Sequence, residues 1–143
     1  MLAKRTSLSL FANIRKGGLI AVHLRDDDEL ISVRLTDGTK DMMIATKQGS
    51  LIRFEEEQIR PMGRTAAGVK GISLRDDDEV VSMEIIEPGS NILHVTEKGY
   101  GKQTPESEYR RINRGGKGVL TCRVTDKTGE VVTVKAVSGE DDL

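Results

Sequence analysis

The sequence repeats itself, and this repeat constrains the fold more than any other feature. The run LRDDDELIS that starts at Leu24 returns as LRDDDEVVS at Leu74, 50 residues later. At the same offset, Gly18 recurs as Gly68 and Gly118. In the third copy, TDKTGEVVT replaces the acidic run with one extra residue. Periods of roughly 20–50 residues are typical of stacked or radially arranged supersecondary units.

Within each unit the apolar segments are short, rich in β-branched residues and bounded by Gly, Asp or Lys. This pattern is typical of β-strands, and no window carries a sustained apolar stripe with the 3.6-residue period of a helix. We therefore expect strands at 19–24, 30–35, 42–46, 50–54, 69–74, 80–86, 92–96, 100–104, 119–124 and 131–137.

Four short strands in a unit of this length describe the blade of a propeller-like fold. The predicted fold class is all-β: a β-pinwheel or propeller-like arrangement of four-stranded blades in a partial, open ring. We expect residues 1–143 to form one partial domain. Its units are predicted at 1–54, 55–104 and, truncated, 105–143.

Charges gather at particular positions of the repeat, although the formal net charge is only −1. One turn is acidic, RDDDE at 25–29 and again at 75–79. The turn before the first strand is basic and rich in Gly, and its three versions are NIRKGGL, RPMGRTAAGVKG and YRRINRGGKGV. Units related by rotation would place the basic turns on one surface. Such a belt suits the phosphate backbone of DNA.

This basic belt is the predicted DNA-binding site. Lys and Arg would neutralise phosphates, while the glycines would let the main chain approach closely and turn its N–H groups outward. Few side chains there suit base edges, so we expect binding to be independent of sequence. The candidate residues are Arg15, Lys16, Arg60, Arg64, Lys70, Arg110, Arg111, Arg114 and Lys117.

Two other interpretations of the basic turns stay open. Glycine turns with cations also occur as ordinary solvated hairpins. A propeller-like scaffold that binds another protein is an alternative function. It predicts exposed apolar patches and little salt-dependent affinity for DNA.

The sequence indicates no catalytic constellation, no cofactor and no metal site. The acidic runs lack the alternating ligands and the sharp-turn glycine of a calcium loop, and RGGKG lacks the spacing of a P-loop. His23 and His94 lie at non-equivalent positions of the repeat. The single cysteine, Cys122, permits no internal disulfide, and no apolar run approaches the ~18 residues of a membrane span. We expect a non-enzymatic chain in the cytoplasm, with no membrane partner.

Three stretches, GRTAAGVKGISLRDDDEVVSMEII, VTEKGYGKQTPESEYR and NRGGKGVLT, closely resemble the C-terminal domain of the DNA gyrase A family. The resemblance covers essentially the whole chain. It implies about three blades of a six-bladed pinwheel whose blades exchange strands and which bends duplex DNA around its perimeter, supporting negative supercoiling. It also implies two partners in the intact heterotetramer: the rest of gyrase A, which carries the catalytic tyrosine, and gyrase B, which carries the ATPase. The related chain of topoisomerase IV is the alternative, and the regular repeat favours gyrase.

The run INRGGKG is similar to the gyrase box of that family, which reads QRRGGKG. Ile112 and Asn113 replace its leading Gln and Arg. The residues that match are Arg114, Gly115, Gly116, Lys117 and Gly118. The resemblance therefore implies a degenerate box in a final blade, and a chain that binds DNA without completing a wrap. The unpaired strand edges of a partial ring should also favour self-association.

Overall fold

A computed structural model describes residues 1–13, 16–121 and 123–138. In that part of the chain the regular elements are short strands and 3₁₀ turns, so the predicted all-β class is confirmed. In chain order they are β1 (Leu2–Ala3), η1 (Leu8–Phe11), β2 (Asp41–Thr46), β3 (Ser50–Glu55), η2 (Glu56–Gln58), β4 (Val69–Lys70), β5 (Val80–Ile86), β6 (Asn91–Thr96), β7 (Gly101–Pro105), η3 (Glu106–Glu108), β8 (Val119–Leu120) and β9 (Val131–Val137).

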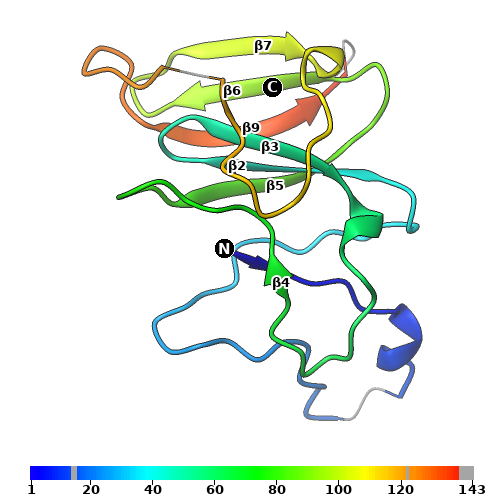
Figure 1. Cartoon of the computed structure of the whole chain (residues 1–143). Coiled ribbons are helices and arrows are strands. Elements are labelled where there is room, and N and C mark those ends of the chain that lie inside the picture. Colours follow the sequence, from blue (N-terminus) through cyan, green and yellow to red (C-terminus); the bar gives the residue numbers. More distant parts are fainter. Residues whose placement is uncertain (14–15, 122, 139–143) are drawn as a thin grey trace.

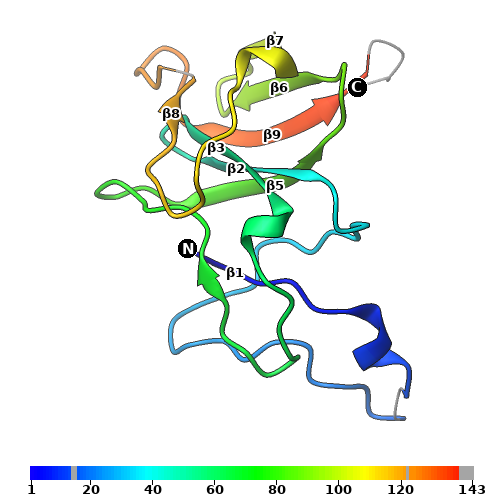
Figure 2. The same cartoon turned by 45° about the vertical axis from the view of Figure 1, so that its right-hand side comes forward.

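The strands form three antiparallel sheets. The largest has the order β5-β2-β3-β8, the next β7-β6-β9, and the smallest is the pair β1-β4. In Figures 1 and 2 the β7-β6-β9 sheet lies at one end of the molecule, the four-stranded sheet in the middle and the β1-β4 pair at the other end. The arrangement is propeller-like and open, as predicted.

Each sheet draws its strands from successive repeat units. In the middle sheet the β2–β3 hairpin comes from the first unit, β5 from the second and β8 from the third. The β6–β7 hairpin pairs in the same way with β9 of the following unit. The four strands of a blade therefore do not all belong to one unit.

Strand β2 lies at the centre of the core because both of its faces are buried. Side chains alternate between the two faces of a strand. Met43 and Ala45 accordingly pack in one apolar cluster, which includes Ile92 and Val134 of the β7-β6-β9 sheet. The alternate side chains of β2 pack in a second cluster with Phe54 and residues of the second unit. The middle sheet thus packs against apolar side chains on both of its faces.

The strands predicted at 19–24 and 30–35 are wrong. The second segment corresponds to β5, which pairs with the first strand of the hairpin before it. The corresponding partner of 30–35 would be the first strand of an earlier hairpin. Of that hairpin, the described residues include only β1. Without that partner, its apolar side chains stay in solvent: Val33 is 69% exposed and Leu35 is 72% exposed.

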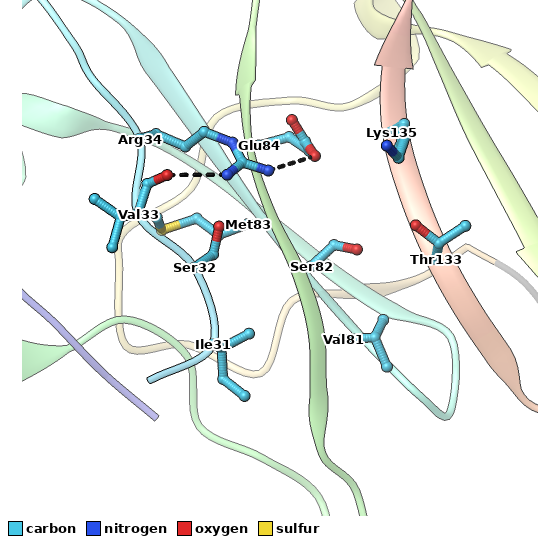
Figure 3. Close-up of a pocket in the computed structure, with 10 residues that line it drawn as sticks. All are labelled: Ile31, Ser32, Val33, Arg34, Val81, Ser82, Met83, Glu84, Thr133 and Lys135. Atoms are coloured by element: carbon cyan, nitrogen blue, oxygen red, sulfur yellow. Dashed lines mark hydrogen bonds and ion pairs between the residues drawn. The ribbon is translucent and has the colours of Figure 1, made fainter. Parts of the chain in front are cut away.

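The segment 30–35 runs beside β5 without pairing to it as a strand. Figure 3 shows Arg34 and Glu84 facing each other across a shallow pocket, with Arg34 Nη2 3.0 Å from Glu84 Oε1. Thr133 and Lys135 of β9 line the same pocket. An ion pair between side chains therefore links this segment to β5.

The strands predicted at 69–74 and 119–124 are present but shorter. They are reduced to the two-residue strands β4 and β8, while the bounds of β5 and β9 are as predicted. Cys122, which falls within the strand predicted at 119–124, lies outside the described residues.

The histidine of β6 links two sheets. His94 is buried, and its Nε2 lies 2.8 Å from Thr121 Oγ1, just after β8. The Thr121 backbone N–H donates to Gly49 O in the middle sheet at 2.9 Å. Burial, together with the nearby charge of Lys102, lowers the pKa of His94 to about 4.

Acidification should therefore destabilise the fold through His94. Because its pKa is lower in the folded state than the ordinary value of 6.5, protonation favours the unfolded chain. We expect the free energy of unfolding to fall by up to about 3 kcal/mol between pH 6.5 and pH 4, as measured by urea unfolding. His94→Gln should remove most of this slope. His23→Gln, at an exposed histidine, should keep it, and an equal effect of both would contradict the assignment.

Close backbone approaches make two glycines necessary. Gly68 and Gly118 precede β4 and β8 with φ of +103° and +74°. A Cβ at Gly68 would collide with Ala3 O, and one at Gly118 would collide with Leu51 O. The glycines thus let one unit's strand lie against the hairpin of an earlier unit.

Gly118→Ala should destabilise the chain more than Gly18→Ala. Both positions have left-handed φ, which costs a non-glycine residue about 1–2 kcal/mol. A Cβ at Gly18 meets nothing within 4 Å, whereas one at Gly118 meets a backbone carbonyl and should cost about 1–3 kcal/mol more. Urea unfolding of both variants at low protein concentration measures the difference. Equal midpoints would contradict the close-approach role.

Candidate nucleic-acid interface

An arginine on β3, the second strand of the β2–β3 hairpin, positions the next basic turn. Arg53 Nη1 donates to Glu106 Oε2 at 2.7 Å, to Glu106 O at 2.9 Å and to Tyr109 O at 3.0 Å. Arg5, 48 positions earlier in the chain, makes the equivalent contacts with Ile59 O, at 2.6 Å, and with Glu56. The 3₁₀ turns η2 and η3 are therefore held against earlier strands. The basic turns that follow them begin at residues whose positions these contacts fix.

A buried carboxylate completes this arrangement. Asp41 is 6% exposed and accepts hydrogen bonds of 2.8 Å from Arg53 Nε and from Arg111 Nε. Burial alone would raise the pKa of Asp41, but the hydrogen bonds from Arg111 and Arg53 outweigh it and hold that pKa below its usual value. The side chain therefore stays ionised at neutral pH.

The backbone of the RGGKG turn is used inside the fold. The Arg114 N–H donates to Gln58 Oε1 at 2.8 Å, and the Gly115 N–H donates to Gly71 O at 2.7 Å. Gly116 O accepts from the Ser73 N–H at 2.8 Å. For Gly115, the expectation of an outward-facing N–H is wrong, because the turn docks onto the segment that follows β4.

Three of the predicted DNA-binding arginines are occupied by internal contacts. Arg111 Nη1 lies 2.8 Å from Glu55 Oε1, in addition to its bond to Asp41. Arg114 donates to Gln58 O at 2.9 Å and to Lys70 O at 3.1 Å. Arg64 donates to Ile20 O at 2.8 Å. Part of their hydrogen-bonding capacity, and for Arg111 its charge, is already satisfied by the protein.

The other predicted cations are exposed. Among the described residues, no ion-pair or hydrogen-bond partner is found for the side chains of Lys16, Arg60, Lys70, Arg110 and Lys117. Arg15 lies outside the described residues. These exposed cations are the ones that a polyanion can reach.

Lys70 lies close to the RGGKG turn, although the two come from different units. Its Cβ and Cδ are 3.9 Å from the position that a Cβ on Gly115 would occupy, and Arg114 binds its carbonyl. Arg75 Nη1 reaches Lys117 O at 3.3 Å and also contacts Ser50 Oγ. We call Lys70, Arg75, Arg114 and Lys117 the basic cluster.

Sequence reasoning missed two arginines that contact the basic turns, Arg75 and Arg53. Arg75 opens an RDDDE run, which the sequence assigns to an acidic turn, yet its side chain reaches the basic turn of the next unit. Arg53 lies within β3, and nothing in its local sequence marks it as the residue that holds η3. Arg5 is the counterpart of Arg53, 48 positions earlier in the chain. The same offset separates β1 from β3 in their pairings with β4 and β8, and an alignment of the units at this offset would have pointed to Arg53.

No helix in the described ranges is long and apolar enough to cross a membrane. The same part of the chain contains no group of three or more His, Cys, Asp or Glu residues placed to hold a metal ion.

Comparison with known proteins gives consistent matches along the chain. The family described as DNA gyrase C-terminal domain, beta-propeller, matches at 2–37, 40–87 and 90–138. The DNA gyrase A protein of Halalkalibacterium halodurans is 68% identical over 142 residues, which are 99% of this chain and 17% of that protein. The DNA gyrase A protein of Clostridium acetobutylicum is 56% identical over 140 residues, which are 98% of this chain and 17% of that protein. The chain thus spans about a sixth of the length of these relatives.

Solved structures share the fold. The C-terminal domain of a DNA topoisomerase IV superposes with a TM-score of 0.89 at 27% identity, covering 96% of this chain and 43% of that one. A DNA gyrase A C-terminal domain gives a TM-score of 0.79 at 30% identity, covering 86% of this chain and 42% of that one. The E. coli ParC C-terminal domain, at 14% identity and a TM-score of 0.66, covers 82% of this chain and 49% of that one.

Arg53→Ala should destabilise the molecule, because it leaves the buried Asp41 and the partly buried Glu106 each short of a partner. Removing one member of such a network costs about 3 kcal/mol. The matched control is Arg110→Ala at an exposed position, where the change should stay within about 0.5 kcal/mol. Urea unfolding at pH 7 measures both. A similar small effect for both variants would mean that Arg53 does not hold the turn.

Proposed function

Because this chain belongs to the DNA gyrase C-terminal domain, beta-propeller, family, we propose that it binds duplex DNA without sequence preference and bends it along its basic turns. Bending of this kind would support negative supercoiling by a type II topoisomerase. The longer relatives are DNA gyrase A proteins, and this chain would serve as a DNA-binding part of such a protein.

The observation that carries this proposal is the set of exposed cations around the last basic turn. Lys70, Arg110 and Lys117 are exposed, and within the described chain their side chains have no ion-pair partner. Cations in this state release the counterions of DNA when they meet phosphates, which is the main source of sequence-independent affinity. Cations that are already paired with carboxylates contribute less to the affinity for DNA.

The internally bonded arginines have a second role in this proposal. Arg114 donates hydrogen bonds to Gln58 O, which precedes β4, and to Lys70 O, at the end of β4. It therefore fixes the position of Lys70 relative to the RGGKG turn. We infer that Arg111 and Arg114 act mainly by placing the exposed cations, with a weaker direct contribution to DNA binding.

Bending requires several contacts acting together. Curving ~20–30 bp smoothly costs on the order of 1–6 kcal/mol, which exceeds what one or two exposed ion pairs supply. Successive basic turns along the chain offer several contacts. Lys16 and Arg60 of the earlier turns, both exposed, would extend the contact beyond the basic cluster.

The chemistry of a topoisomerase would be supplied by other parts of the assembly. We propose that this chain is non-catalytic and works with the rest of gyrase A and with gyrase B. Duplex DNA as partner would place it at the nucleoid in the cytoplasm. The same functions in a topoisomerase IV are the main alternative, favoured by the TM-score of 0.89, whereas the identities of 56–68% favour gyrase.

A protein-binding scaffold is the second candidate, and one observation favours it. Large exposed apolar side chains are concentrated in the first 40 residues, among them Leu8, Leu30, Val33 and Leu35. Such a patch suits a protein partner. The two functions differ in salt dependence, because contacts between apolar surfaces release few counterions.

The test is duplex-DNA affinity measured against salt concentration. A triple alanine variant at Lys70, Arg110 and Lys117 should reduce the slope of log K against log salt by about 0.9 for each lost phosphate contact, or about 2.7 in total. The control with the same change in charge is a triple alanine variant at Lys98, Lys127 and Lys135. Absence of binding, or equal losses in both variants, would contradict the proposed site.

Arg111→Ala separates positioning from direct contact. If Arg111 mainly holds Asp41 and Glu55, the salt slope of this variant should change by much less than 0.9. The same titration of Lys117→Ala supplies the comparison, since that lysine is expected to contact phosphate directly. A change in slope as large for Arg111→Ala as for Lys117→Ala would assign Arg111 to the DNA contact itself.

A further inference from the structure

We propose that Ser50 and Arg75 position Lys117 for contact with a DNA phosphate, so that this one contact depends on three units of the repeat. The serine belongs to the first unit, the arginine to the second and the lysine to the third. This inference rests on the proposed DNA binding, and it names residues that control the binding without contacting DNA themselves.

Three consecutive carbonyls of the RGGKG turn are bound by one short segment of the second unit. Ser73 Oγ donates to Gly115 O at 2.6 Å, and the Ser73 N–H donates to Gly116 O at 2.8 Å. Arg75 Nη1 donates to Lys117 O at 3.3 Å. This segment therefore holds the turn, and Arg75 supplies the contact to the lysine itself.

Ser50 anchors the guanidinium that makes this contact. The same Nη1 of Arg75 also donates to Ser50 Oγ, at the start of β3. Ser50 is only 3% exposed, and its N–H donates to Thr46 Oγ1 at 3.0 Å within the β2–β3 hairpin. A buried and fixed serine of one unit thus determines where an exposed arginine of the next unit lies.

The side chain of Lys117 remains available to a ligand. It is exposed, and no ion-pair or hydrogen-bond partner is found for it in the described ranges. Its backbone is held from the other side as well, because Gly118 lies against Leu51 where β8 pairs with β3 (Figure 2). A glycine-rich turn left free would have to be ordered on binding, which costs affinity. Holding the turn before DNA arrives removes this cost.

Arg75 contributes its position more than its charge. It is followed by Asp76 and Asp77, which are exposed and have no ion-pair partner among the described residues. These carboxylates offset the charge of the arginine and repel a phosphate backbone. Lys117, in contrast, stands between two glycines. We therefore assign the phosphate contact to the lysine and its placement to the arginine.

The equivalent pairing earlier in the chain lacks both the serine and the lysine. Ala67 stands at the position of Lys117 in the repeat. Leu2 stands at the position of Ser50, since β1 pairs with β4 in the register in which β3 pairs with β8. The strand pairing thus forms without the serine, which supports a role for Ser50 in placing the lysine.

The affinity of Ser50→Ala for duplex DNA tests the inference, because this substitution changes no charge and removes no group that DNA can reach. We expect the affinity to fall about fivefold, as for the loss of one hydrogen bond. In a Lys117→Ala background the same substitution should have no further effect. Arg75→Ala should behave likewise. If Arg75 contacted phosphate directly, its removal in that background would still lower the salt slope by about 0.9.

Ser82→Ala is the matched control. Ser82 of β5 is also buried, and its Oγ accepts one hydrogen bond, from the Val134 N–H at 3.1 Å. Its replacement should lower the urea midpoint and leave the affinity for DNA unchanged. The urea midpoints of all variants also establish that each chain is folded under the conditions of the DNA titration.

The possible failures of this inference and of the proposed function are distinguishable. Unchanged affinity of Ser50→Ala, together with the expected loss for Lys117→Ala, would overturn this inference alone. So would an equal loss of affinity in Ser82→Ala, or a loss for Ser50→Ala that persists in the Lys117→Ala background. Absence of DNA binding by the unmodified chain would overturn the proposed function and this inference with it.

Discussion

Backbone hydrogen bonds between successive units hold this molecule together, because none of the sheets in the described part of the chain is formed by one unit alone. The β2–β3 hairpin receives β5 from the following unit and β8 from the unit after that. Each unit therefore gives strands to sheets centred on earlier hairpins. The basic turns lie on the connections that carry these strands, so strand exchange also fixes where the cations stand.

This construction divides the basic residues into two kinds. Arg53 and Arg114 bind backbone carbonyls of other units and act as parts of the framework. Lys70 and Lys117 extend from the same turns into solvent. A near-zero net charge does not exclude DNA binding, because some carboxylates, such as Asp41 and Glu106, are paired with Arg53 of the framework, while Lys70 and Lys117 are exposed.

The sequence predicted the elements better than their partners. The apolar pattern gave the bounds of β5 and β9, because alternation within a strand is local. It assigned the same structure to 30–35, whose pattern specifies a buried face and carries no information on whether the partner strand is present. The same limit applies to the site. Arg111 meets Asp41, 70 positions earlier in the chain, and local charge patterns do not reveal such a pairing.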